Sequence, residues 1–150
     1  MSGLGPYKWP LQYVSFGTYA WQWSGNKPDR AVATKILVPA GGTATHNTQL
    51  VPGGSISGTS VDSAGQPTSA ILYPLSARTG ELAGPVAEGG RPATFTITRL
   101  AAQDIKLRYH HQILGPGACW YLGQTTFAAA TKIKVKAGLD TPGIALTPCN

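Results

Sequence analysis

The sequence predicts an all-β protein, a single-domain antiparallel sandwich or barrel with an extended N-terminal arm. Three observations support this prediction. Short runs rich in β-branched and aromatic residues recur along the chain, bounded by Gly, Pro, Asn or Asp. The 19 Gly and 12 Pro residues interrupt every stretch that would otherwise form a helix of more than about two turns. A chain of 150 residues suits one domain, and it can bury a core without metals or disulfides.

The predicted strands follow one another along the whole chain. The aromatic stretch from Tyr13 to Trp23 supplies the first. The later ones are AVATKILV (31–38), SAILY (69–73), ATFTITRL (93–100), DIKLRYHHQIL (104–114), ACWYLGQTTF (118–127) and TKIKVKA (131–137). Residues 39–69 are dominated by Gly, Pro, Ser and Thr and form either one long loop or two short strands, around 48–51 and 55–61. Seven or more short strands in one domain are typical of a sandwich or barrel.

Aromatic residues are concentrated near the N-terminus. Residues 7–25 hold seven of the thirteen aromatics, which are 4 Trp, 6 Tyr and 3 Phe. Some of these side chains are expected in the core, but together they exceed what one short hairpin can cover. Residues 1–10 are expected to form an extended arm ahead of a β domain spanning 11–150, and an arm bearing Tyr and Trp is typical of a docking segment. The predicted partner-binding residues are Tyr7, Trp9, Tyr13, Tyr19, Trp21 and Trp23.

Positive charge is concentrated at the other end of the chain. Residues 91–150 carry seven basic and two acidic residues, whereas residues 1–90 carry five and four. Strand alternation places basic side chains on one face and apolar ones on the other. The candidate anion-facing residues are Lys106, Arg108, His110, Lys132, Lys134 and Lys136. The alternatives are a solvated face or lysines that guard an edge strand. A nucleic-acid partner is less favoured, because most of the aromatics lie far along the chain from most of the charge.

No catalytic motif is present, and the protein is expected not to be an enzyme. Neither GGSISG nor GTSVDSAG spells the G-x-S-x-G nucleophile elbow, and GPGACWYLG does not match a phosphate-binding loop. No CxxC, HxH or HExxH spacing occurs, so no metal and no cofactor are expected. Cys119 beside His110 or His111 could form a thiol nucleophile pair, but a small buried Cys is the preferred interpretation.

The cellular context is inferred from the ends of the chain and its hydropathy. The start, MSGLGPYKWP, lacks the features of a signal peptide, and no run of eighteen apolar residues indicates a membrane span. We therefore expect a protein made in the cytoplasm, or one whose leader has been removed, with no membrane partner. In a reducing compartment, Cys119 and Cys149 are expected to be buried or spare thiols, although one bridge between them stays open.

Together, the arm MSGLGPYKWP, the segment PAGGTATHNTQLVPGGSISG and the missing catalytic motifs resemble small structural proteins of bacteriophage virions, especially capsid decoration (cement) proteins. The resemblance is one of composition and layout and transfers no site residue. It implies a homo-oligomeric, often trimeric, β protein located in the virion, which clamps a larger protein shell through extended arms. The alternatives are a carbohydrate- or receptor-binding β module and a nucleic-acid-packing coat protein.

Overall fold

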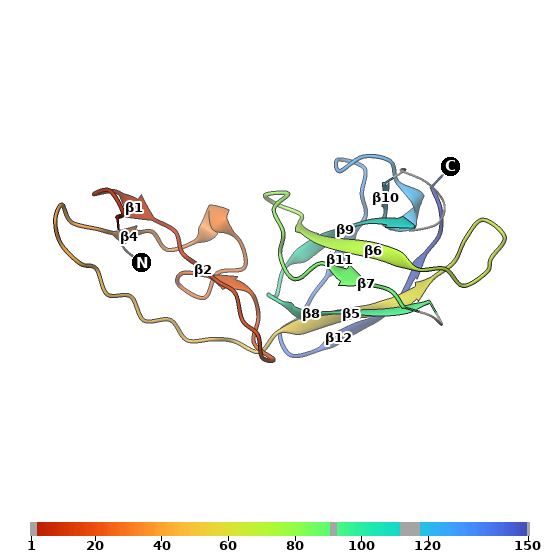
Figure 1. Ribbon diagram of the computed structural model, residues 1–150, viewed down its shortest axis with the longest axis horizontal. Coiled ribbons are helices and arrows are strands. Elements are labelled where there is room, and N and C mark those ends of the chain that lie inside the picture. The colour runs from red at the N-terminus through yellow and green to blue at the C-terminus, as the bar shows by residue number, and fades with distance from the viewer. Residues whose placement is uncertain (1–2, 91–92, 112–117, 150) are drawn as a thin grey trace.

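Two β-sheets pack face to face in the C-terminal two thirds of the chain (Figure 1). The computed structural model describes residues 3–90, 93–111 and 118–149. The first sheet has the order β10 (Cys119–Trp120), β9 (Asp104–His111), β6 (Ala70–Ser76) and β7 (Ala87–Glu88), and β11 (Lys132–Lys134) also pairs with β9. The second sheet has the order β12 (Asp140–Leu146), β5 (Gly54–Ser60) and β8 (Thr94–Leu100).

The core of the sandwich follows from strand alternation. Every second residue of β6 and of most of β8 is buried, as expected for strands with one face on a core. Tyr109 and Leu107 on β9 are fully buried in the same interior. The buried cluster comprises Ile56, Leu72, Ala83, Phe95, Ile97, Leu100, Ile105, Leu107, Tyr109, Cys119, Ile133, Val135, Ile144 and Leu146.

One strand pair departs from the antiparallel pattern. Strand β12 pairs with β5 in parallel, and its register shifts between Thr141 and Ile144. Gly58 lies beside this irregularity, and a Cβ atom there would stand 1.8 Å from the Ile144 carbonyl oxygen. Only glycine lets the two backbones approach this closely.

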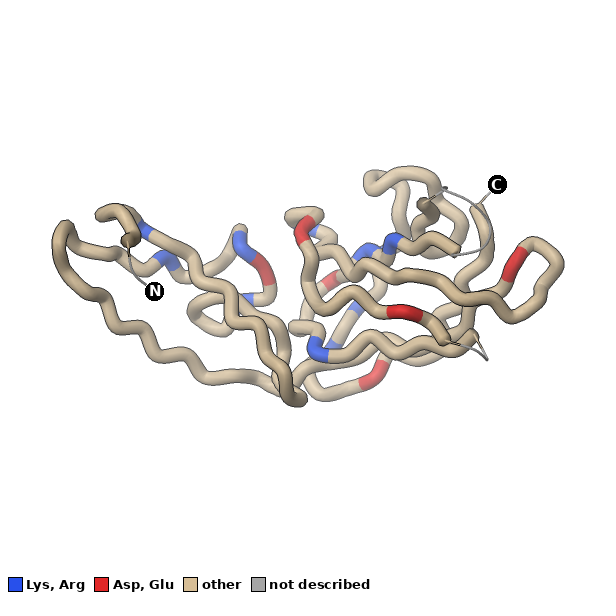
Figure 2. Tube along the Cα trace, in the orientation of Figure 1, with Lys and Arg blue, Asp and Glu red and all other residues tan. Residues whose placement is uncertain are grey.

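The N-terminal lobe, residues 3–50, projects from the sandwich (Figure 1). Its strands are β1 (Lys8–Trp9), which pairs with β4 (Ile36–Leu37), and β2 (Gln12–Tyr13), which pairs with β3 (Gln22–Trp23). A 3₁₀ turn at Arg30–Val32 begins at Asp29, whose side chain accepts a hydrogen bond from the Ala31 N–H. After β4, residues 39–50 run along the outer margin of the lobe back to β5, with no charged residue (Figure 2).

The base of the lobe is fixed to the sandwich by polar contacts. The Trp21 N–H donates to the Arg99 carbonyl of β8 at 2.8 Å. The buried side chain of Gln22 holds the segment that leads into β5, accepting a hydrogen bond from Val51 N at 3.0 Å and donating to Gln49 O at 2.8 Å. Arg99, at the end of β8, donates to the Ser15 carbonyl at 3.0 Å. These contacts hold the lobe in a defined position relative to the sandwich.

The two cysteines form a disulfide, which the expectation of free thiols did not anticipate. Cys119 on β10 is bonded to Cys149 just after β12, across 30 residues of chain. The Tyr109 hydroxyl donates to the Thr147 carbonyl beside it. The C-terminal segment is therefore held against β9 and β10 by a covalent bond as well as by packing.

The all-β sandwich prediction is confirmed, but several strand boundaries are wrong. Within 13–23 only the two ends are strands, and Tyr19 forms an isolated bridge with Pro52. Within 31–38 only Ile36–Leu37 is a strand, and within 118–127 only Cys119–Trp120 is. Residues 48–51 form no strand, whereas β5 covers most of 55–61. Residues 112–114 of the expected strand 104–114 lie outside the described residues. The division into a 1–10 arm and an 11–150 domain stays a prediction. Within the expected arm, Lys8–Trp9 forms β1 and pairs with β4.

Candidate functional site

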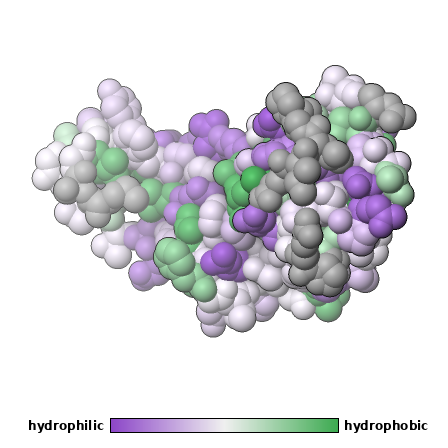
Figure 3. Space-filling model, turned by 45° about the vertical axis from the view of Figure 1, so that its right-hand side comes forward, coloured by the Kyte–Doolittle hydropathy of each residue, from purple (hydrophilic) through white to green (hydrophobic). Residues whose placement is uncertain are grey.

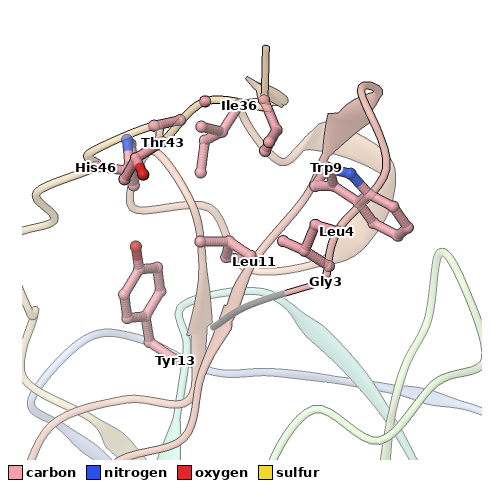
Figure 4. A pocket seen from close by; sticks show the side chains of 11 residues that line it. Gly3, Leu4, Trp9, Leu11, Tyr13, Ile36, Thr43 and His46 are labelled. Atoms are coloured by element: carbon pink, nitrogen blue, oxygen red, sulfur yellow. The ribbon is translucent and has the colours of Figure 1, made fainter. Parts of the chain in front are cut away.

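A groove of about 540 Å³ lies within the N-terminal lobe, between its strands and the returning segment (Figure 4). Tyr13 on β2 and Leu11, just before β2, line the groove, together with Trp9 on β1 and Ile36 on β4. Its lining is completed by Gly3, Leu4, Val38, Gly42, Thr43, Ala44 and His46. No lining residue is charged, so the groove suits an apolar or neutral occupant.

His46 is a polar side chain in the lining of the groove. Its ring lies 6.4 Å from the ring of Tyr13, and Figure 4 shows both on the same side of the groove. The Nε2 atom is shielded from solvent and has no hydrogen-bond partner among the described residues. A buried polar atom without a partner marks a place where a further group would be stabilised.

The predicted partner-binding aromatics divide into exposed and sheltered rings. Tyr7 is 67% exposed and Tyr19 is 45% exposed. Trp9, Tyr13, Trp21 and Trp23 are half-buried, and two of the indoles donate within the lobe, Trp9 to Gly5 O and Trp21 to Ser15 O. The exposed rings are therefore available to a partner, while the tryptophans mainly build the lobe itself.

Sequence reasoning missed the most exposed aromatic residue of the lobe. Phe16 is 92% exposed, at a bend where the backbone N–H of Gly17 bonds to the Ser15 hydroxyl. Leu37 on β4 is a further exposed apolar residue, at 59%. The signal was the Ser-Phe-Gly-Thr run, which favours a turn in the middle of an expected strand. Figure 3 shows apolar surface over the lobe and its junction with the sandwich.

The predicted basic stripe is interrupted at Lys106. This side chain is only 7% exposed, because the segment after β10 covers it. Its Nζ donates to the carbonyls of Phe127 and Ala128 and lies 4.3 Å from the centroid of the Phe127 ring. Lys106 therefore holds a loop in place instead of facing an anion, and the stripe is split into two parts.

The two remaining parts of the basic face have different surroundings. Lys132, Lys134 and Lys136 are exposed, and Lys132 forms a weak ion pair with Asp104 at 3.7 Å. Arg108 is exposed at the other end of β9, with its guanidinium 5.8 Å from the centroid of the Tyr73 ring. His110 stacks on the same ring, with centroids 5.7 Å apart.

A serine, a histidine and an aspartate come near one another, but without the geometry of a nucleophile. Ser60 Oγ lies 3.4 Å from His111 Nδ1, and both residues are buried. Burial lowers the pKa of His111. The charge of Asp62 partly opposes this decrease, and the neighbouring His110 adds to it. A fully buried hydroxyl cannot meet a substrate, and Cys119 is held in the disulfide.

Comparison with known proteins gives no relative: no family model, no curated protein and no solved structure matches this chain. Within the described residues, no cluster of three or more His, Cys, Asp or Glu side chains is arranged to bind a metal. No helix in that part of the chain has the length and hydrophobicity of a membrane span.

Proposed function

We propose that this chain is a non-enzymatic structural subunit of a virus particle, a capsid decoration or coat subunit that assembles through its N-terminal lobe. The observation that carries the proposal is the exposure of Tyr7, Phe16 and Tyr19 on a lobe that also contains a groove with a neutral lining. The proposed partners are further copies of the chain and a larger protein shell, and the proposed location is the virion.

The exposed area supports an interface. The exposed parts of these three rings amount to about two whole aromatic side chains, on the order of 300–500 Å². A standard interface buries about 800 Å² on each partner, so the rings alone would supply roughly half of one side. Tyr is enriched at interfaces and contributes area at low entropic cost.

A double variant, Tyr7→Ser with Phe16→Ser, tests the role of the rings. Both residues are exposed, so the far-UV circular dichroism spectrum and the melting temperature should change little. Self-association, measured by sedimentation, should weaken by at least about tenfold if the rings lie in the interface.

The matched control is Leu122→Asn, which removes an apolar side chain of 57% exposure from the 3₁₀ turn Tyr121–Gly123 that follows β10 in the sandwich. Asn suits the backbone there, where φ is 61°. An equal loss of association in this control would show general loss of surface hydrophobicity, and an unchanged double variant would refute the role of the rings.

A carbohydrate-binding module is the second candidate, because Trp9 and Tyr13 line the groove. Aromatic faces beside His46 and Thr43 could stack on a sugar ring and bond its hydroxyls. Glycan-array binding that is lost in Tyr13→Ala would favour this reading. Absence of glycan binding together with a stable oligomer would favour the structural subunit.

A further inference from the structure

Residues 43–49 form an extended segment without a strand partner. Among the described residues, the backbone N–H and C=O groups of residues 43–48 make no hydrogen bond, and Gln49 O accepts only from the Gln22 side chain. Burial alternates along the segment as in a strand, with Ala44, His46 and Thr48 partly buried and the odd-numbered residues exposed. At about 3.3 Å per residue, the seven residues form an unpaired strand-like edge with a length of about 23 Å.

Other strand edges in this molecule carry features that prevent pairing. The edge strand β12 contains Pro142 and a register shift, and β11 carries Lys132 and Lys134. Strand β8 follows a left-handed residue, Ala93, and contains another, Arg99, near its end. These are the devices by which natural sheets keep their edges from joining another chain. Residues 43–49 have no lysine, no proline and no bulge, so this edge is unprotected.

The charge pattern indicates what covers the edge. Residues 36–61 contain no Lys, Arg, Asp or Glu, although the chain as a whole has a net charge of +6. Two copies meeting at most other surfaces would repel each other, whereas here no like charges would face one another. A neutral strand is therefore the region where a second copy approaches at the lowest electrostatic cost.

The segment is also compatible with two-fold pairing. About an axis through His46, antiparallel pairing sets Thr45 opposite Asn47 and Ala44 opposite Thr48. Residues of one parity then share a face, so the partly buried residues Ala44, His46 and Thr48 of both copies lie on one side. The unpartnered Nε2 of His46 lies at the centre of this arrangement.

We propose that residues 43–49 pair, antiparallel and about a two-fold axis, with residues 43–49 of a second copy of this chain. The pairing joins the two neutral edges into a two-stranded ribbon between N-terminal lobes. The inference rests on the proposed self-association through the lobe and names the element that would make it.

Charge-swap variants test the pairing directly. One variant carries Thr45→Lys with Asn47→Lys, and the other carries Thr45→Glu with Asn47→Glu; all four substitutions are on exposed side chains, so folding should be unaffected. Each variant alone sets like charges opposite one another and should dimerise at least about tenfold more weakly than wild type. An equimolar mixture should recover association to within about threefold of wild type, as a mixed dimer.

The matched control is Ser63→Lys with Gln66→Lys, which adds the same charge at an exposed turn at the opposite end of the molecule. It should associate like wild type. If the Lys and Glu variants associate like wild type, or if their mixture shows no recovery, the strand pairing is refuted. If wild type itself is a monomer at all concentrations, the proposed function fails with it.

Discussion

Reduction of the Cys119–Cys149 disulfide should destabilise the fold strongly. The bond closes a loop of 30 residues, and the loop-entropy relation gives a loss of about 12 cal/mol/K, or about 3.6 kcal/mol at 25 °C. For a chain of this length each kcal/mol shifts the melting temperature by roughly 2–4 °C, so a fall of about 7–14 °C is expected.

The assay compares thermal and urea unfolding of the oxidised protein, the reduced protein and Cys149→Ser. Position 149 is chosen because it is half-buried, whereas serine at 119 would place a hydroxyl in the core. Mass spectrometry first confirms that the untreated protein is lighter by two hydrogen atoms than the reduced one. If reduction of the confirmed bond changes the free energy of unfolding by less than about 1 kcal/mol, the reasoning is wrong.

Two further perturbations probe the sandwich. Gly58→Ala should lower the free energy of unfolding in urea by about 3 kcal/mol, the upper end for overpacking, because the new Cβ would meet the backbone of Ile144. The control Gly90→Ala has open space around the new Cβ and should be within about 0.5 kcal/mol of wild type. Burial raises the pKa of Tyr109 from 10.0 to about 12, and the hydrogen bond to Thr147 opposes this by lowering the pKa. As pH rises, the tyrosine therefore loses its proton in the unfolded state before it does so in the folded state. The free energy of unfolding should therefore fall between pH 10 and pH 12, by about 1.4 kcal/mol at pH 11, and Tyr109→Phe should abolish that slope.

The sandwich could be predicted from the sequence because its strands are short apolar or alternating runs. In β8 and β9 apolar side chains recur at every second position, from Phe95 to Ile97 and from Ile105 to Tyr109, and these side chains are buried. Strand β6 is a nearly continuous apolar run, of which every second residue is buried. Strand β12 could not be found this way, because Pro142 and Gly143 argue against a strand; they are accommodated at the sheet edge, where the register with β5 shifts between Thr141 and Ile144. The interruption of the basic stripe was equally hidden, because Lys106 is covered by a loop distant along the chain.

The candidate site was predicted in part. Composition pointed to the aromatic residues near the N-terminus, and their role as a binding surface stays a prediction; composition also did not separate exposed from sheltered rings. Tyr7 and Phe16 are exposed, whereas the indoles of Trp9 and Trp21 bond to backbone carbonyls nearby. Such contacts depend on bends within the lobe, and strand periodicity from Tyr13 to Trp23 gives no sign of them.

Sedimentation velocity of the intact chain over the micromolar concentration range tests the central claim most directly, which is that the N-terminal lobe is an assembly surface. The account predicts a species whose mass is a multiple of 15.6 kDa, and the two-fold strand pairing requires an even multiple. A trimer as the final species would contradict the strand pairing but leave self-association intact. A monomer at every concentration would contradict the central claim.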